Sequence, residues 1–487
     1  MPNPAEHLRP RTASRRRTLL ALSAAALALS ACAGLPKSSE RAQLTPAAAL
    51  ETDRSFAAPT AEWISDRWWD AYGDPQLSKL IDEALANSPT LAQAEARLRS
   101  AEAQTDQSRA ATLPSMDAKG AVTDTEASRA IGFPSFIQQY LPKGYQGNAQ
   151  VTLNASYDLD LFGKNRAALA ASVSEAEAQR ADLVQARLTL STAVAQAYAD
   201  LARLSAERDA AAASVENRIA SGKLVADRVR NGLDTQAELH QAQAATPSSQ
   251  ADVEALDEQM LIARHRIAAL IGAGPDRGLD IAIPASETIK PFGLPADLKA
   301  NLVGRRPDIV AARLRAEAAA KKVDAAHAAF YPNIVLNAYI GQQALGLGNM
   351  FTPQAAIGSI GPAVTLPIFH GGQIRAQYHG AQADYDAAVD AYNQTLVNAF
   401  QDVADSAASV QSAQRQLAER QEAYAAGEQA YAIAQLRYRG GLSSYVSVLS
   451  AEDALITQRK ALADARSRAF TLDIAMIRAL GGGFNGG

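Results

Sequence analysis

The sequence predicts a mainly α-helical chain that carries membrane-spanning β-strands and contains one unit twice. Residues 163–229 and 373–437 are alanine-rich and nearly free of Gly and Pro, and their apolar residues recur every three or four positions, which predicts very long helices. Four other runs alternate apolar and polar residues over about 9 to 12 positions, the length of a tilted strand that crosses a bilayer core. Comparing the chain with itself reveals the duplication.

The N-terminus has the order of a secretory signal. Three arginines, residues 15–17, precede an uncharged run, residues 18–31, which at about 14 residues is shorter than the roughly 20 that a spanning helix needs, so we expect cleavage. Residues 29–32, Leu-Ser-Ala-Cys, resemble a bacterial lipobox, so Cys32 is the expected first mature residue and acylation site. Ala33 follows where an Asp would indicate inner-membrane retention, which favours the outer membrane. The alternative is an inert cysteine in an ordinary leader.

Composition excludes several classes of protein. The single cysteine rules out an internal disulfide. Removal of residues 1–31 takes the net charge from −4 to about −8, and basic patches with interleaved aromatics are missing, so nucleic acid is not an expected partner. The six histidines lack metal-ligand spacing and no nucleophile elbow occurs, so we expect no catalytic, cofactor or metal site and no enzymatic activity.

The duplication is visible without gaps at an offset of 218 residues. Pro89 and Pro307 open the two matching segments. Identical residues then recur in pairs: Ala94 and Ala312, Arg97 and Arg315, Asp106 and Asp324, Ala110 and Ala328, Ala111 and Ala329, Pro114 and Pro332. The expected segments are a signal peptide at 1–31, an N-terminal segment at 32–80, a first repeat at 81–272, a connector at 273–304 and a second repeat at 305–487.

The expected assembly follows from the number of predicted strands. They are expected near residues 114–124, 148–160, 332–341 and 357–368, with a Gly-rich loop at 341–353. Four strands cannot close a barrel, and an open edge in lipid leaves backbone groups without partners at several kcal/mol each. We therefore expect three chains to form a twelve-stranded β-barrel that continues into a long α-helical barrel. A free coiled-coil rod is the alternative for the helices.

Several short motifs resemble one family of proteins. They are Trp68-Trp69, residues 72–77 (Tyr-Gly-Asp-Pro-Gln-Leu), residues 87–89 (Asn-Ser-Pro), residues 305–309 (Arg-Arg-Pro-Asp-Ile), Tyr331-Pro332, residues 436–441 (Leu-Arg-Tyr-Arg-Gly-Gly) and residues 478–483 (Arg-Ala-Leu-Gly-Gly-Gly). In combination they resemble the outer membrane factors, the TolC- and OprM-like exit ducts of tripartite efflux pumps. With the lipobox, the chain is most similar to the lipoprotein (NodT-like) branch that serves pumps of the resistance-nodulation-division class.

This resemblance, which covers residues 60 to 483, implies a homotrimer in the outer membrane with a periplasmic helical tunnel. It implies a belt around the tunnel, formed by residues 40–80, 273–304 and 470–487, where Pro, Gly and short elements interrupt the long helices. The implied partners are a periplasmic adaptor protein, an inner-membrane transporter and outer membrane lipid. The alternative is a periplasmic coiled-coil adaptor or scaffold lipoprotein, which would lack strands of bilayer length.

Each repeat reverses direction at a glycine, Gly232 in the first and Gly440-Gly441 in the second. The resemblance implies that these tips close the tunnel. The implied gate residues are Glu238, Val446, Ser447 and Ser450 in rings, with Tyr438 and Arg437 or Arg439 as closing links. Ser447 and Ser450 stand where relatives often carry Asp, so whether acidic or hydroxyl side chains close the gate stays open.

Two further features of the tips follow from the resemblance. The expected adaptor-docking residues are Gly232, Leu233, Gly441 and Leu442. Glu452 and Asp453 lie close to the gate in sequence. Helical spacing alone leaves both a lumenal and a solvent-facing position open for these two acids.

Overall fold

The computed structural model describes residues 42–485, except 53, 57–59, 127–133, 135, 137–139, 141–143, 285–293 and 296–297. The expected signal peptide and Cys32 lie outside the described residues. The chain divides into two compact units. The sheet unit comprises Met1–Gln43, Glu102–Ser174 and Ala316–Ala388, and the helical unit comprises Leu44–Ala101, Glu175–Arg315 and Val389–Gly487.

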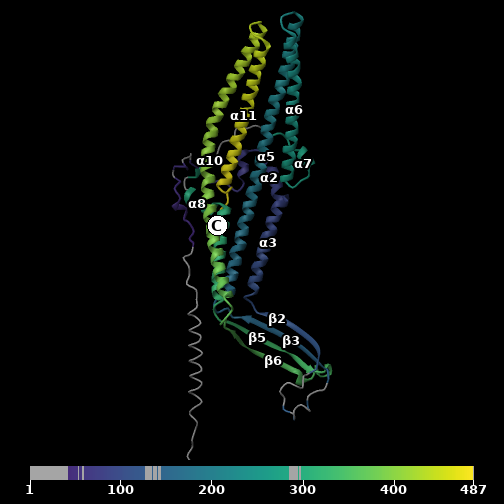
Figure 1. The fold of residues 1–487 in the computed structure, drawn as a ribbon, viewed down its shortest axis with the longest axis vertical. Coiled ribbons are helices and arrows are strands. Elements are labelled where there is room, and N and C mark those ends of the chain that lie inside the picture. Colours follow the sequence, from purple (N-terminus) through teal and green to yellow (C-terminus); the bar gives the residue numbers. More distant parts are fainter. Residues whose placement is uncertain are drawn as a thin grey trace, which may run out of the picture. The chain divides into compact units, whose positions relative to one another are not determined.

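The sheet unit contains the four strands that alternation predicts. They are β2 (Ser115–Thr125), β3 (Gln146–Asp158), β5 (Asn333–Leu345) and β6 (Ala356–Thr365). All neighbours pair antiparallel, in the order β2-β3-β5-β6 (Figure 1). Each repeat therefore contributes two strands, and the two repeats meet where β3 pairs with β5.

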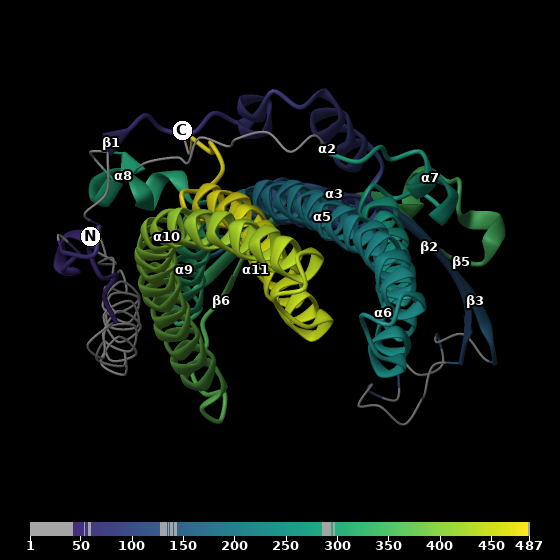
Figure 2. The ribbon, with the colours of Figure 1, turned by 90° about the horizontal axis from the view of Figure 1, so that it is seen from above.

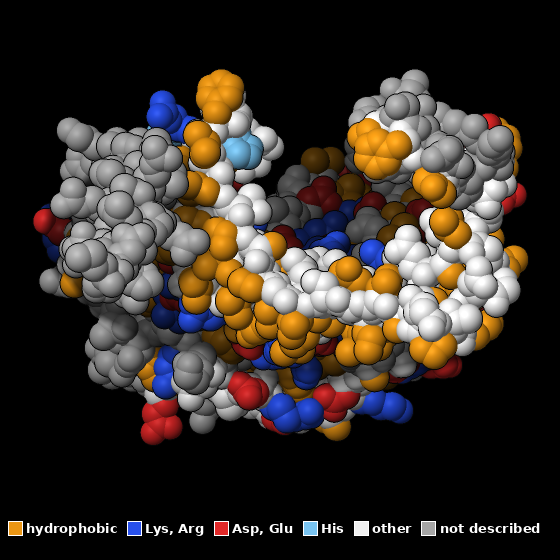
Figure 3. All heavy atoms as spheres, turned by 90° about the horizontal axis from the view of Figure 1, so that it is seen from below, with side chains coloured by type: hydrophobic (Ala, Val, Ile, Leu, Met, Phe, Trp, Pro, Cys, Tyr) orange, Lys and Arg blue, Asp and Glu red, His pale blue; other side chains and the backbone are white. Residues whose placement is uncertain are grey.

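The register of the ladders gives the sheet two different faces. Because paired residues in an antiparallel sheet point the same way, Met116 with Ala155 and Leu153 with Ile340 share one face. The exposed large apolar side chains of this face are Met116, Val122, Val151, Leu153, Tyr157, Ile340, Ile360 and Val364, while Ile334, Leu336 and Gln342 on the same face are half-buried. Figure 3 shows hydrophobic side chains gathered over the strands. The opposite face is mostly polar, with Asp117, Lys119, Thr123, Gln150, Thr152, Asn154, Asn337, Gln343 and Ser359.

The Gly-rich loop expected at 341–353 begins later in the structure. Gly341 continues β5, which ends only at Leu345, so the connection to β6 is shorter than the Gly-rich stretch suggested. A Cβ atom at Gly341 would lie 2.1 Å from the carbonyl oxygen of Val151 on β3. The glycine therefore permits a close approach of two backbones, a second role that glycine has in strands besides ending them.

Three helices of the first half, α3, α5 and α6, have counterparts of equal length in the second, α9, α10 and α11. In chain order the helices are α2 (Pro75–Asn87), α3 (Pro89–Ala110), α5 (Lys164–Arg230), α6 (Gln236–Leu270), α7 (Pro275–Leu279), α8 (Leu298–Arg305), α9 (Pro307–Ala328), α10 (Gln373–Arg439) and α11 (Tyr445–Ala479). α5 and α10 each have 67 residues, and α6 and α11 each have 35. Within the described residues, no helix is both long enough and apolar enough to cross a membrane.

Short elements lie between the helices, as the sequence predicts for the belt. They are η2 (Ala47–Ala49), β1 (Thr60–Ala61), η3 (Trp68–Tyr72) and β4 (Leu294–Pro295). Two more, η4 (Leu347–Asn349) and η5 (Pro353–Ala355), lie instead between β5 and β6. β1 and β4 form a small parallel pair. The expected break at 470–487 is wrong in its first part, because α11 continues to Ala479 and only the glycines beyond it leave the helix.

The core of the helical unit lies where these short elements meet the long helices. Trp68, Leu201, Ile267, Leu396 and Ile474 are among its fully buried side chains, and they come from η3, α5, α6, α10 and α11. This core therefore joins both repeats.

Polar contacts explain one motif that carries the resemblance. Tyr72 donates to Asp473 on α11 at 2.5 Å, and Tyr198 on α5 donates to Asp74 at 2.7 Å. Asp74 also caps α2, since its side chain accepts from the backbone of Gln76 and Leu77. Residues 72–77 thus connect α2 to α5 and α11.

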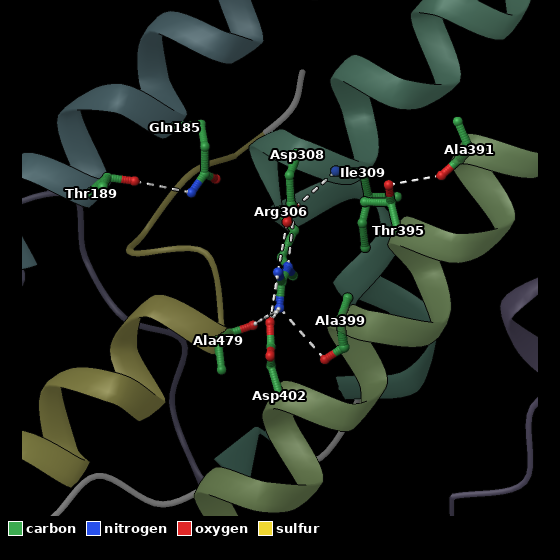
Figure 4. A network of polar contacts seen from close by, with 10 residues as sticks. All are labelled: Gln185, Thr189, Arg306, Asp308, Ile309, Ala391, Thr395, Ala399, Asp402 and Ala479. Carbon is green, nitrogen blue, oxygen red and sulfur yellow. Dashed lines mark hydrogen bonds and ion pairs between the residues drawn. The ribbon is translucent and has the colours of Figure 1, made fainter. Parts of the chain in front are cut away.

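The contacts of Arg306 give a structural role to a second motif of the resemblance, residues 305–309. Its guanidinium is 7% exposed and donates to Asp308 at 2.6 Å and to Asp402 on α10 at 3.1 Å (Figure 4). It also donates to the carbonyl of Ala479, the last residue of α11, at 3.2 Å. Gly481 follows in a left-handed conformation, and a Cβ there would lie 2.0 Å from the carbonyl oxygen of Arg305. Both ends of the second repeat are therefore packed together, and α10 is joined to them.

Candidate functional site

The tips of the two helix pairs end in the same backbone motif. In the first, the amides of Gly232 and Leu233 donate to the carbonyls of Val229 and Arg228 at 3.0 and 2.8 Å. In the second, Gly441 and Leu442 do the same with Tyr438 and Arg437, also at 3.0 and 2.8 Å. These are Schellman motifs, which need a left-handed residue after the helix. Gly232 has φ +72° and Gly441 has φ +71°.

A tip contact, formed by Arg228, Asp234 and Tyr438, connects the two helix pairs. Tyr438, near the end of α10, is only 2% exposed, and its hydroxyl donates to Asp234 in the turn between α5 and α6. Arg228 donates from Nε to the same carboxylate at 2.9 Å, and its guanidinium lies 4.8 Å from the centre of the Tyr438 ring. Figures 1 and 2 show the two pairs, α5 with α6 and α10 with α11, ending in these turns.

The environment of the tip contact keeps the Tyr438 hydroxyl and the Arg228 guanidinium protonated. Burial, together with the hydrogen bond to Asp234, raises the pKa of the Tyr438 hydroxyl. The hydrogen bond to Asp234 likewise raises the pKa of the Arg228 guanidinium. The phenol therefore remains a donor at every pH at which the protein would be studied.

Apolar packing surrounds the tip contact. Val225, Ala242, Tyr431, Tyr445 and Val448 form a buried cluster with Tyr438, and these residues come from all four helices. The rings of Tyr438 and Tyr445 have centroids 5.6 Å apart. The tips of the two helix pairs therefore share a packed core, and packed cores rearrange between discrete states instead of deforming gradually.

Glu238 has a local role that sequence reasoning did not foresee. It is the third residue of α6, and its carboxylate accepts from the backbone amide of Thr235 at 2.8 Å. The Thr235 hydroxyl accepts in turn from the Glu238 amide, which completes a capping box.

The other expected gate residues divide into exposed and buried positions. Val446, Ser447 and Ser450 are exposed on one side of the first turns of α11, whereas Tyr445 and Val448 on the other side are buried. Arg437 and Arg439 are exposed, and neither side chain forms an ion pair or hydrogen bond with the residues that the structure describes. Of the residues expected as closing links, Tyr438 alone lies in the tip contact.

Arg228 and Asp234 are the members of the tip contact that sequence reasoning missed. From the long helices onward the repeats align at an offset of 209 residues, since α5 and α10 start at Lys164 and Gln373. At this offset Arg228 matches Arg437, while Asp234 matches Ser443. A difference between the two turns could have identified Asp234, because the first repeat has an acid at the position where the second has a serine.

The remaining sequence expectations concern the outer surface of the tips and the two nearby acids. Leu233 is 64% exposed and Leu442 is 73% exposed, each directly after its turn glycine. Glu452 is buried among the helices, while Asp453 is exposed. Neither of the two alternatives for Glu452, a lumenal or a solvent-facing side chain, describes its position. Within the described residues, no group of three or more His, Cys, Asp or Glu side chains could hold a metal ion.

Comparisons with known proteins agree on one family. A family model described as outer membrane efflux protein matches residues 80–273 and 300–482. The fusaric acid resistance protein FusA of Burkholderia cepacia is 35% identical over 381 residues, which are 75% of this chain and 69% of that protein. The multidrug resistance outer membrane protein MdtP of Escherichia coli strain K12 is 30% identical over 467 residues, 94% of this chain and 95% of that protein.

Solved structures give the same result. The crystal structure of the outer membrane protein VceC from Vibrio cholerae has a TM-score of 0.81 and 41% identity, and it covers 87% of this chain and 100% of that one. The outer-membrane channel OprN also has a TM-score of 0.81, with 26% identity and coverage of 92% and 97%. The resemblance inferred from the sequence motifs and the expected fold class are thus confirmed. The chain belongs to the outer membrane efflux protein family.

Proposed function

We propose that three copies of this chain form an outer membrane channel that is the exit duct of a tripartite efflux pump. The channel exports small molecules passively, and the energy comes from an inner-membrane transporter of the resistance-nodulation-division class, coupled through a periplasmic adaptor. The chain carries cargo without changing it chemically. The relatives' names, which refer to fusaric acid resistance and multidrug resistance, support small organic molecules as cargo.

The observation that carries this proposal is the two-faced sheet with two unpaired outer strands. Among the described strands, β2 pairs only with β3, and β6 pairs only with β5. The exposed apolar side chains of the sheet are suited to contact with lipid, and unpaired backbone groups in lipid cost several kcal/mol each. Pairing β6 of one copy with β2 of the next removes both edges, and three copies give twelve strands. A coiled-coil scaffold has no use for such a sheet, so this alternative is disfavoured.

The tips are proposed as the gate of the channel. The tip contact holds the two helix pairs of each subunit together. Glu238, Val446, Ser447 and Ser450 are proposed to form rings around the lumen. The exposure of Val446, Ser447 and Ser450 in the single chain supports this, while Glu238 is half-buried. Three copies of Glu238 would make an acidic ring that favours cations. Arg437 and Arg439 are proposed as links to neighbouring subunits, since both side chains are exposed.

Two attachment sites complete the proposal. Leu233 and Leu442, exposed beside Gly232 and Gly441, form the apolar surface on which the periplasmic adaptor docks. Cys32 carries the lipid anchor in the outer membrane, with residues 1–31 removed. Residues 32–80 and 273–304, with the glycines after Ala479, form the belt around the tunnel, and the two repeats are residues 81–272 and 305–487.

The proposal is tested by reconstitution of the full mature chain. Trimers purified in detergent are added to planar lipid bilayers, and conductance is recorded with the oligomeric state of the same sample. We expect a trimer that separates into single chains only on heating, and discrete conductance steps. A water-soluble monomer without conductance would disprove the proposed function.

A further inference from the structure

A second polar contact joins the helix pairs farther from the turns than the tip contact. Glu452 on α11 is 2% exposed, and its Oε2 lies 3.5 Å from Nε of Arg218 on α5. Arg218 lies ten residues before Arg228 on α5, which at 1.5 Å per residue places it about 15 Å along the helix. The two contacts are therefore separate layers of one interface.

Arg218 connects three helices through one guanidinium. Besides Glu452, its Nη2 lies 2.7 Å from Asp453 on α11, and its Nη1 donates to the carbonyl of Ala245 on α6 at 3.0 Å. Ser214 on α5 donates to Glu452 Oε1 at 3.4 Å. Separation of α5 and α6 from α10 and α11 must therefore break the contacts of Arg218 with the two acids while keeping its contact with Ala245.

The carboxylate of Glu452 is poorly compensated where it lies. Its hydrogen bond from Ser214 is long, and the nearby Arg218 is shared with Asp453 and Ala245. Tyr431 on α10 and Tyr445 on α11 are the other titratable groups that face it, and the buried Tyr445 hydroxyl has no hydrogen-bond partner among the described residues. An ionised carboxylate is costly in such surroundings unless its pairing is excellent.

We propose that Glu452 and Arg218 form a second lock, beyond the tip contact, through which the pH of the periplasm sets how readily the two helix pairs of each subunit separate. This inference rests on the proposed channel function. Glu452 acts as a positioning residue, since it is buried between the helices, where its carboxylate lies beside Arg218 and accepts from Ser214.

The direction of the pH effect follows from the burial of Glu452. Burial raises the pKa of this carboxyl, while Arg218 and the hydrogen bond from Ser214 oppose the shift. A proton therefore binds more tightly in the packed state than after water has reached the carboxyl. Protonation of Glu452 therefore stabilises the packed state fully below the ordinary pKa of about 4.3. This stabilisation is lost as the pH rises through the raised pKa of the packed state. Each unit of difference between the two pKa values changes the ratio of packed to separated states by about tenfold.

Conductance of the full trimer in planar bilayers between pH 4 and pH 8 tests the second lock. We expect wild-type open occupancy to rise with pH. Glu452→Gln, which removes the charge but keeps the shape, should hold the low-pH occupancy across the range. Arg218→Gln should raise occupancy at neutral pH, because the buried carboxylate loses its partner, and the double variant should return to the level of Glu452→Gln. Asp453→Asn, which alters the exposed partner of the same guanidinium, should keep the wild-type rise with pH.

The possible failures are distinguishable. If Glu452→Gln conducts with the same pH profile as the wild type, the second lock is overturned while the channel function stands. If the double variant stays as open as Arg218→Gln, the role of the charge on Glu452 is likewise overturned. If intact wild-type trimers show no conductance at any pH, both the second lock and the proposed function fall.

Discussion

Replacement of Tyr438 by Phe should open the channel without unfolding it. The substitution deletes one hydroxyl, which donates to Asp234, and leaves the buried ring in contact with Arg228 and Tyr445. Asp234 keeps its ion pair with Arg228 at 2.9 Å, so the carboxylate is not left unpaired. The tip contact therefore weakens by one hydrogen bond and no more.

The size of the effect follows from that single bond. Hydrogen bonds to charged groups contribute about 1.5 to 3 kcal/mol, and the retained Arg228 places the loss of Tyr438→Phe near the lower value. A loss of 1.4 kcal/mol corresponds to about tenfold in an equilibrium constant. If the three subunits open together, independent losses add and the shift becomes about a thousandfold.

Single-channel recording in planar bilayers measures this shift as open occupancy. Tyr424→Phe is the matched control, because it deletes a hydroxyl that donates to Glu428 within α10, so the lost hydrogen bond does not connect the two helix pairs. Heat-modifiable migration of the trimer verifies that both variants are assembled. Intact Tyr438→Phe trimers with wild-type open occupancy would refute the reasoning.

Three further predictions concern stability and insertion. Gly441→Ala should lower the free energy of unfolding of the trimer by about 1 to 2 kcal/mol, the cost of a left-handed residue with a side chain. Gly222→Ala in the interior of α5 should raise that free energy by about 1 kcal/mol; equal shifts in the thermal midpoint would contradict the assigned turn. Leu201→Ala in the buried core should cost about 2 to 5 kcal/mol in chemical unfolding, and a loss below 1 would argue against that core. Ile360→Arg on the apolar face of the sheet should make insertion into liposomes less favourable by about 2 to 4 kcal/mol, whereas Ser359→Arg on the opposite face should not. A larger loss of insertion for Ser359→Arg than for Ile360→Arg would show that the faces are misassigned.

The sequence predicted the fold well because its signals are long and occur twice. The alternation that gave the strands and the Gly-free stretches that gave α5 and α10 extend over many residues, so single exceptions did not matter. Errors arose where one residue type has two uses. Gly341 suggested a loop, yet it continues β5 because the backbone of β3 passes so close.

The gate was only partly predictable for a different reason. Periodicity places a residue on one side of a helix, but it does not say which distant residue faces it. Tyr438 could be selected from its motif, whereas its partners Arg228 and Asp234 lie more than 200 positions away and depend on how the two repeats pack. Glu452 is similar, since its burial depends on the approach of α5, which its own helix does not encode.

The equal lengths of α5 and α10, 67 residues each, and of α6 and α11, 35 each, constrain how such a duct can change during evolution. In a ring of three subunits, the six turns then end at one level. Removing seven residues from α5 alone would leave three turns about 10 Å short of the others and open a notch in the rim. Variants adapted to a wider or narrower periplasm should therefore carry matched insertions or deletions in both halves of the gene.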